Sequence, residues 1–205
     1  MNTPFDITPA ALPGVYTITP FYAEDQRGYF LKSIERDVFA RFGLSLDIHE
    51  DFETYSRKDV IRGLHIQTRD QQIKIVRAVC GSVLDVVVDI RPDSAFFGKW
   101  FSIILSQDNH TAIWVPAGFA HGFRVLSEIA IVSYKCIGRF LPDFDSGIRW
   151  NDMDIAIQWG IDKPILSEKD ASLPLFRDYC HINRLETSWL AFMHSVMGCG
   201  KEINT

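Results

Sequence analysis

The 205-residue sequence has no apolar run that approaches the roughly 20 residues needed to cross a bilayer. The longest apolar stretch with strand character, residues 83–90, is interrupted by Asp85 and Asp89. The first 13 residues contain neither a basic segment nor an apolar core, so we expect no signal peptide and a cytoplasmic protein. A net charge of −5 offers no basic excess, which argues against nucleic acid as a partner.

Cysteine is scarce, and its spacing is irregular. The sequence contains Cys80, Cys136, Cys180 and Cys199, and no Cys-x-x-Cys motif. Without that motif, the usual signature of a zinc or redox site is missing. In a cytosolic chain we expect these cysteines to be reduced, buried thiols.

Short strand-like segments separated by turn residues dominate most of the chain. The predicted strands cover residues 15–18, 29–31, 61–66, 72–79, 82–90, 100–105, 112–115, 118–125 and 129–137. A polar turn is expected at residues 23–28, and a short helix at residues 36–42 with Gly43 as its C-cap. Strands at this spacing predict an all-β sandwich or barrel, which we assign to a domain at residues 1–176.

The pattern changes after the last predicted strand. Residues 150–172 predict a loop that Trp159 and Ile161 anchor. Over residues 185–197 the apolar side chains recur at helical spacing, and Gly198 follows as a stop signal. We therefore expect residues 177–205 to form a helical extension packed on the barrel or on a partner subunit.

Two segments each place one histidine on a strand beside glycines. They are Arg62-Gly63-Leu64-His65 and residues 116–123, which contain His121. Closure of a barrel would bring both histidines into one cavity. Because Gln67 stands where a second metal-binding histidine would be needed after His65, the two histidines alone make a poor metal site, and we expect none.

A series of motifs in fixed order supports a named resemblance. The motifs lie at residues 25–30, 60–65, 72–77, 81–91, 97–100, 118–123, 134–135, 148–152 and 166–170. Together they resemble the dTDP-4-dehydrorhamnose 3,5-epimerase family over residues 14–176. The resemblance implies a cupin-type jelly-roll barrel with short helices, and cofactor-free epimerisation of a nucleotide-linked 4-keto-6-deoxy sugar. It also implies a homodimer whose subunits share their N-terminal strands.

The resemblance implies roles for four catalytic residues. His65 is the base, Asp170 its hydrogen-bond partner, Lys74 the stabiliser of the enolate oxygen, and Tyr134 the acid. Carbons 3 and 5 of such a sugar flank the carbonyl, so a positioned base can remove their protons, and an acid on the opposite face can return them. A lysine can hold the developing oxyanion without a metal.

The resemblance also implies contacts to the nucleotide diphosphate. Arg27 and Arg62 would bind phosphate, because guanidinium groups match its geometry with paired hydrogen bonds. Phe30 would offer the nucleobase an apolar surface. His121 would line the same pocket, with Asp85 as its support.

Four residues depart from the family pattern at positions that usually hold the nucleotide or phosphate. Lys32 replaces a glutamate, Glu50 and Phe52 stand where Gln and Asn are usual, and Phe140 replaces a second tyrosine. Because lysine offers only hydrogen-bond donors, the nucleotide stays open between dTDP, GDP and CDP. Loss of the hydroxyl at Phe140 would alter a phosphate contact or restrict the reaction to one carbon.

Three alternatives to an epimerase remain open from the sequence. One is a nucleotide-sugar 3,4-ketoisomerase, another is a metal-dependent cupin oxygenase, and the third is a non-catalytic nucleotide-sugar-binding protein. Bound iron or zinc together with EDTA-sensitive activity would favour the oxygenase.

Overall fold

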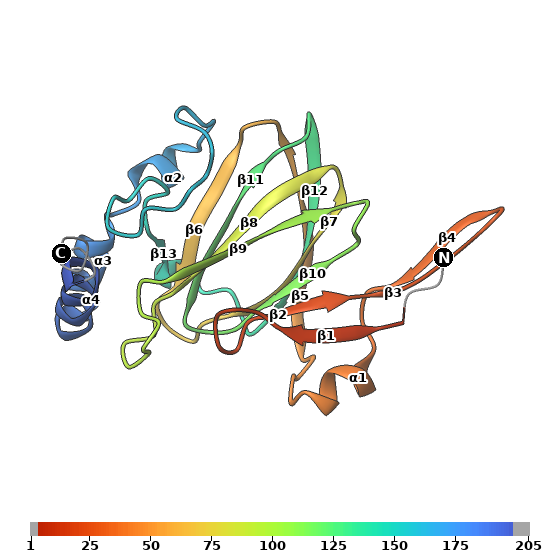
Figure 1. Ribbon diagram of the computed structural model, residues 1–205, viewed down its shortest axis with the longest axis horizontal. Coiled ribbons are helices and arrows are strands. Elements are labelled where there is room, and N and C mark those ends of the chain that lie inside the picture. Colours follow the sequence, from red (N-terminus) through yellow and green to blue (C-terminus); the bar gives the residue numbers. More distant parts are fainter. Residues whose placement is uncertain (1–3, 199–205) are drawn as a thin grey trace, which may run out of the picture.

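Antiparallel strands form two sheets packed face to face (Figure 1). The computed structural model describes residues 4–198. One sheet has the order β1 (Asp6–Pro9), β2 (Tyr16–Thr19), β10 (Ala112–Val115), β7 (Ile73–Cys80), β12 (Ile129–Ile137) and β5 (Ile48–Arg57). The other has the order β13 (Asp145–Gly147), β6 (Ile61–Gln67), β11 (Phe119–Val125), β8 (Ser82–Asp89) and β9 (Trp100–Ser106). The predicted jelly roll is confirmed.

The space between the sheets is filled by one hydrophobic cluster. Val76 and Val132 contribute to it from one sheet, and Phe123 from the other, all fully buried. Side chains on a strand alternate between its two faces. The inward position of Val132 on β12 therefore also turns Tyr134 and Cys136 inward, toward the end of the barrel that remains hollow.

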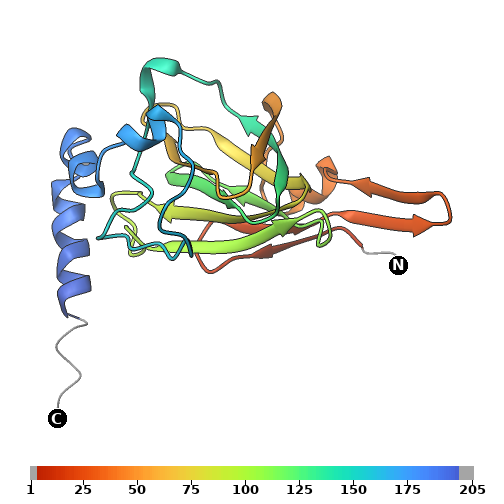
Figure 2. The ribbon, with the colours of Figure 1, turned by 90° about the horizontal axis from the view of Figure 1, so that it is seen from above.

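The C-terminal segment covers the outer face of the five-stranded sheet. It contains α2 (Glu168–Ser172), α3 (Phe176–Ile182) and α4 (Glu186–Gly198), with α4 standing at one end of the barrel (Figures 1 and 2). Phe176 and Phe192 from these helices share a cluster with Leu64, Val86 and Trp159. The prediction of a loop throughout residues 150–172 is wrong at α2, a single turn too short to produce an apolar period. No helix among the described residues is long and apolar enough to span a bilayer.

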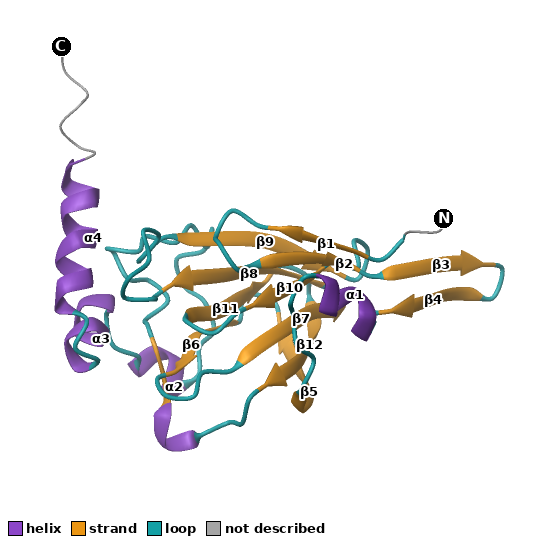
Figure 3. Cartoon of the chain, turned by 90° about the horizontal axis from the view of Figure 1, so that it is seen from below, coloured by secondary structure: helices purple, strands orange, loops and turns teal. Residues whose placement is uncertain are grey.

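A β-hairpin of β3 (Phe21–Asp25) and β4 (Gly28–Lys32) projects from the end of the barrel opposite α4 (Figures 1 and 3). The turn predicted at residues 23–28 is wrong in extent, because β3 continues to Asp25 and leaves only residues 26–27 between the strands. The short helix α1 (Arg36–Arg41) follows the hairpin, as predicted, and a 3-10 helix (Pro142–Phe144) precedes β13. Four strands, β1, β3, β5 and β13, were not predicted from the sequence.

Gly63 allows β6 and β11 to approach each other closely beside the two histidines. Its φ is +123°, and a Cβ at this position would lie 2.6 Å from the Gly122 Cα and 2.8 Å from the His121 carbonyl oxygen. We expect Gly63→Ala to lower the free energy of unfolding by about 2 kcal/mol or more, measured by urea denaturation. Gly28→Ala is the matched control, since Gly28 has φ +115° with no atom within 4 Å of the added Cβ. If the two variants lose the same free energy of unfolding, the cost comes from the positive φ alone and not from the close approach of β6 and β11.

Candidate active site

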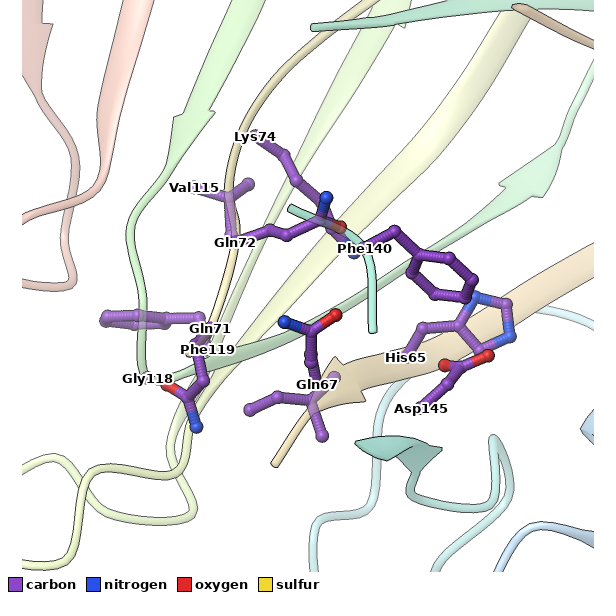
Figure 4. A pocket seen from close by; sticks show the side chains of 11 residues that line it. His65, Gln67, Gln71, Gln72, Lys74, Val115, Gly118, Phe119, Phe140 and Asp145 are labelled. Carbon is purple, nitrogen blue, oxygen red and sulfur yellow. The ribbon is translucent and has the colours of Figure 1, made fainter. Parts of the chain in front are cut away.

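A cavity of about 300 Å³ opens at the hollow end of the barrel, between the two sheets. Its lining includes eight residues that were singled out from the sequence: Glu50, Phe52, Arg62, His65, Lys74, His121, Tyr134 and Phe140. A smaller cavity of about 40 Å³ adjoins it and shares His65, Lys74 and Phe140, which Figure 4 shows together with Asp145. The barrel thus brings together residues that lie up to 90 positions apart in the sequence.

His65 and Asp170 form a hydrogen-bonded pair at the wall of this cavity. His65 is on β6, and its Nε2 lies 2.5 Å from Oδ1 of Asp170, which is on α2. Ser167 caps α2 by accepting a hydrogen bond from the Asp170 backbone N–H at 3.0 Å. Burial opposes ionisation of Asp170, but the hydrogen bond from His65 and the charge of His65 outweigh it and hold the pKa of the carboxyl below its usual range. Because an ionised carboxylate only accepts, Nε2 of His65 donates to Asp170, and in the neutral form of the imidazole Nδ1 then holds the lone pair.

A second histidine–aspartate pair lies directly beside the first. His121 on β11 is the cross-strand partner of His65, and its Nε2 lies 2.9 Å from Oδ2 of Asp85. Both side chains are almost fully buried. Oδ1 of Asp85 is buried with no hydrogen-bond partner in the part of the chain that the structure describes. The support of His121 by Asp85 that the sequence analysis expected is present in the structure.

Tyr134 presents a phenol to the cavity from β12. Its ring stacks on that of Phe52, the residue directly opposite on β5, with centroids 4.9 Å apart and an interplanar angle of 12°. It also meets His121 edge-on at 6.1 Å. Burial, with the nearby charge of Asp85, raises the pKa of the Tyr134 hydroxyl well above its ordinary value. The phenol is therefore protonated at neutral pH and able to donate.

Lys74 and Arg62 bring positive charge to the cavity. Within residues 4–198, neither has a carboxylate within 4.0 Å of its charged nitrogens. Arg62 is held instead by Nε, which donates to Ser56 Oγ at 2.9 Å, and by Nη2, which donates to the Tyr55 carbonyl at 3.3 Å. Two cations that make no ion pair with the described residues suit this cavity to an anionic ligand.

We expect the loss of activity at high pH to follow the deprotonation of Lys74. Burial lowers the pKa of the Lys74 ammonium, so its positive charge is present below that pKa and is lost as the pH rises through it. We expect kcat to fall on the alkaline side at a lower pH than an exposed lysine would give. The limb should move to higher pH in Lys74→Arg, since arginine keeps its charge. The measurement is a pH profile of kcat at saturating substrate, and identical alkaline limbs in the two proteins would rule out Lys74 as their cause.

Three predicted nucleotide-binding residues do not reach this cavity in their own chain. Arg27, Phe30 and Lys32 lie on the projecting hairpin. Arg27 is exposed and its Nη2 pairs with Asp25 at 2.5 Å, while Lys32 Nζ lies 2.7 Å from Glu35 Oε2. Phe30 is 60% exposed.

The cavity also contains residues that sequence reasoning missed. These are Thr54, Gln72, Cys136, Asp145 and Lys169. Gln72 Nε2 donates to Glu50 Oε2 at 2.8 Å. Burial raises the pKa of the Cys136 thiol to about 11, so the thiol stays neutral. Cys136 could have been predicted from the position of Tyr134, because side chains two residues apart on a strand point to the same face of the sheet.

The side-chain amide of Gln67 is hydrogen-bonded to the backbone around it. Its Nε2 donates to the carbonyls of Arg69, Asp70 and Arg139, and its Oε1 accepts from the Leu141 N–H. No three His, Cys, Asp or Glu side chains among the described residues are grouped so that they could hold a metal ion. The donor set therefore does not fit the metal site of a cupin oxygenase.

The fold is shared with solved structures of dTDP-sugar epimerases. A family model described as dTDP-4-dehydrorhamnose 3,5-epimerase matches residues 9–178. The chain belongs to this family, whose named members are epimerases and thus isomerases.

Individual relatives agree with this assignment. The chain is 44% identical over 165 residues to dTDP-4-dehydrorhamnose 3,5-epimerase of Escherichia coli, which covers 78% of this chain and 88% of the relative. It is similar to dTDP-6-deoxy-D-glucose-3,5-epimerase of Legionella pneumophila in complex with dTDP-4-keto-L-rhamnose, with 36% identity, a TM-score of 0.81 and coverage of 84% and 93%. It is also similar to ChmJ, a 3'-monoepimerase from Streptomyces bikiniensis in complex with dTDP-quinovose, with 26% identity, a TM-score of 0.80 and coverage of 92% and 98%.

Proposed function

We propose that the chain epimerises a nucleotide-diphosphate-linked 4-keto-6-deoxy sugar, at carbon 3 or at carbons 3 and 5. The observation that carries this proposal is the His65–Asp170 pair, which shares one cavity with a protonated Tyr134 and with Lys74, a lysine that forms no ion pair with a carboxylate of the described residues. We place the enzyme in the cytoplasm, in the biosynthesis of deoxysugars or of a surface polysaccharide such as a capsule or lipopolysaccharide.

The reaction follows from the protonation states of these groups. His65 Nδ1 takes the proton from carbon 3, and the electron pair of the broken C–H bond moves into an enolate whose negative charge lies on the carbonyl oxygen. The Lys74 ammonium stabilises that oxygen. Tyr134 then gives its proton to carbon 3 on the opposite face, and proton exchange with water resets both groups. The negative charge of Asp170 favours the imidazolium that His65 forms during the reaction.

The substrate class rests on the cations of the cavity and on the relatives. Arg62 has guanidinium N–H groups to offer a diphosphate. The Legionella and Streptomyces relatives bind dTDP-linked sugars, which supports a dTDP-sugar here. Glu50 and Phe52 line the cavity where the resemblance leads us to expect Gln and Asn, so GDP- and CDP-linked sugars belong in the same test. The 3'-monoepimerase among the relatives supports the inclusion of reaction at one carbon only.

The projecting hairpin completes the site of a second copy in this proposal. Tyr29 and Phe30 are 62% and 60% exposed, and aromatic side chains exposed together are typical of contact surfaces. In a homodimer with shared N-terminal strands, Arg27, Phe30 and Lys32 of one subunit would meet the nucleotide held by the other.

Complementation between two inactive variants tests the shared site. One chain carries His65→Ala, and the other carries Arg27→Ala with Phe30→Ala. If the hairpin serves the partner, a mixed dimer contains one fully intact site, and an equal mixture recovers up to about a quarter of the wild-type activity. If co-expressed dimers that are verified to be mixed recover no activity, the hairpin and His65 of the same chain serve the same site, and the shared site is rejected.

Product analysis tests the function itself. The protein is incubated with dTDP-, GDP- and CDP-linked 4-keto-6-deoxy sugars, and the products are reduced and identified by NMR. We expect an epimer at carbon 3, or at carbons 3 and 5, with equal yield in EDTA. A 3-keto product would identify a ketoisomerase. Oxygen consumption with EDTA-sensitive activity would identify an oxygenase, and binding without conversion a non-catalytic protein.

A further inference from the structure

The helix α4 lies outside the part of the chain that matches the epimerase family. The family model ends at residue 178, whereas α4 covers Glu186–Gly198. No described residue of α4 lines the cavity that contains His65. The proposed reaction therefore does not account for this helix.

The helix α4 is apolar on more than the side that packs on the barrel. Among its 13 residues, only Glu186 and His194 are ionisable. Phe192 is buried against the barrel, in the cluster beneath the helices. Leu190 is nevertheless 57% exposed, and Val196 is 43% exposed where α4 passes beyond the sheets (Figures 2 and 3). A helix that is apolar all round is normally buried on all its sides.

A groove of about 820 Å³ lies beside Leu190. The residues that line it include Asp154, Leu175, Arg177, Asp178, Trp189 and Leu190. Leu175 is 39% exposed and adds to the apolar surface that α4 presents. We call this groove, together with Leu190 and Val196, the helical face.

We propose that the helical face is a docking surface for a second copy of this chain. The two copies meet across a twofold axis, so the same residues form both halves of the contact. This contact is separate from the one assigned to the projecting hairpin, because the hairpin and α4 lie at opposite ends of the barrel (Figures 1 and 3). One copy can therefore make both contacts at once. The proposal goes beyond the proposed function and does not rest on it.

The charges beside the groove match those of a second copy. Arg177 and Asp178 are consecutive and exposed, and neither forms an ion pair with another of the described residues. Across a twofold axis, Arg177 of each copy can meet Asp178 of the other, which gives two ion pairs from one pair of positions. A second copy has this complementary pattern by symmetry, whereas an unrelated protein would need a matching pattern of its own.

The end of the chain is poorly suited to cover the helical face. Residues 199–205, which follow α4, have the sequence Cys-Gly-Lys-Glu-Ile-Asn-Thr. Ile203 is the only large aliphatic side chain in this sequence. Because apolar stabilisation is roughly proportional to the area removed from water, one such side chain leaves most of the helical face uncovered.

Leu190→Glu should halve the mass of the assembly measured by sedimentation from about 1 to 100 µM protein. The twofold contact would place two added carboxylates together in an apolar groove, where burial of a charge is costly. The melting temperature should stay close to wild type, since Leu190 is largely exposed. Ile104→Glu is the matched control, because Ile104 is 51% exposed on β9 and lies outside the helical face. The control should keep the wild-type mass.

Exchange of the two charges tests the twofold pairing. Arg177→Asp and Asp178→Arg should each raise the dissociation constant of the contact at least about tenfold, because like charges then face each other. An equal mixture of the two variants should bring it back to within about threefold of wild type, since an acidic copy then meets a basic one. Neither a folding defect nor the docking of a different protein predicts this rescue.

Three outcomes would overturn the proposal. A wild-type mass equal to that of Leu190→Glu at every concentration rejects a second copy on the helical face. Weakening by both charge variants without rescue in the mixture rejects the twofold pairing. A chain that ends at Gly198 should keep the wild-type mass, and loss of the contact in that chain assigns it to residues 199–205 instead. All these measurements are made without substrate, so a protein that converts no nucleotide sugar would reject the proposed function and leave the docking surface intact.

Discussion

His65→Asn should lower kcat/KM by about 10³-fold, the largest effect that we expect from a single substitution outside the protein core. The side chain of His65 is 31% exposed and lines the cavity, so the substitution removes the proposed base without opening a void in a packed cluster. The melting temperature and the nucleotide dissociation constant should therefore stay close to wild type. The assay is epimer formation under kcat/KM conditions, with calorimetric binding of the nucleoside diphosphate measured on the same preparation.

The control for this substitution is His194→Asn. His194 is exposed on α4, at the end of the barrel far from the projecting hairpin, and it lines none of the cavities described here. It should retain full activity. A His65→Asn protein with more than about a tenth of the wild-type kcat/KM would remove His65 from the role of base.

Tyr134→Phe should separate proton removal from inversion. Epimer formation should fall about 10²- to 10³-fold, because no acid remains to protonate the enolate on the face opposite His65. His65 can still remove the proton and return a solvent deuteron to the same face. Substrate recovered from D₂O should therefore carry deuterium with its configuration retained.

The matched control for Tyr134→Phe is Tyr55→Phe. Tyr55 is a neighbouring aromatic on β5 that is 58% exposed, and its hydroxyl is outside the cavity lining. Equal loss of exchange and of epimer formation in Tyr134→Phe would mean that the phenol is needed for proton removal. That result would contradict the assignment of the two residues to opposite faces.

The strands of the barrel core could be predicted because their side chains alternate or are continuously apolar. The residues of β8 and β12 are examples, with buried valines bounded by turn residues. β5 could not be found in this way. It is an edge strand that pairs with β12 alone among the described strands, and its sequence Ile-His-Glu-Asp-Phe-Glu-Thr-Tyr-Ser-Arg is largely polar because most of its side chains are exposed. Its pairing is imposed by the backbone of β12, a tertiary effect that its own composition does not report.

The candidate site could be predicted only in part, for a similar reason. His65, Lys74, Tyr134 and His121 lie on predicted strands, so closure of the barrel was enough to place them together. Lys169 and Asp145 enter the cavity from a one-turn helix and a three-residue strand. Neither element has a periodic signature, so the ion pair between them could not be anticipated. The hairpin shows the opposite limit. Arg27, Phe30 and Lys32 were predicted as nucleotide-binding residues, but their distance from the cavity of their own chain could not be predicted, because it depends on the direction in which β3 and β4 leave the barrel.

The cavity wall formed by Glu50 and Phe52 bears on the choice of nucleotide. Phe52 covers one face of Tyr134, and Glu50 is held by Gln72. A carboxylate and an aromatic ring offer a ligand different contacts from two amides, because an ionised carboxylate only accepts hydrogen bonds and phenylalanine forms none. Comparison of kcat/KM across the three nucleotides would show whether these residues select the base or the sugar.

The measurement that tests the central claim most directly is deuterium incorporation by the wild-type protein in D₂O, followed by NMR of the 4-keto sugar. Acid–base chemistry by His65 and Tyr134 predicts that the epimerised product carries solvent deuterium at carbon 3, and also at carbon 5 if both centres react. Epimer formed without deuterium, or no exchange with any dTDP-, GDP- or CDP-linked substrate, would contradict proton transfer through an enolate in this cavity.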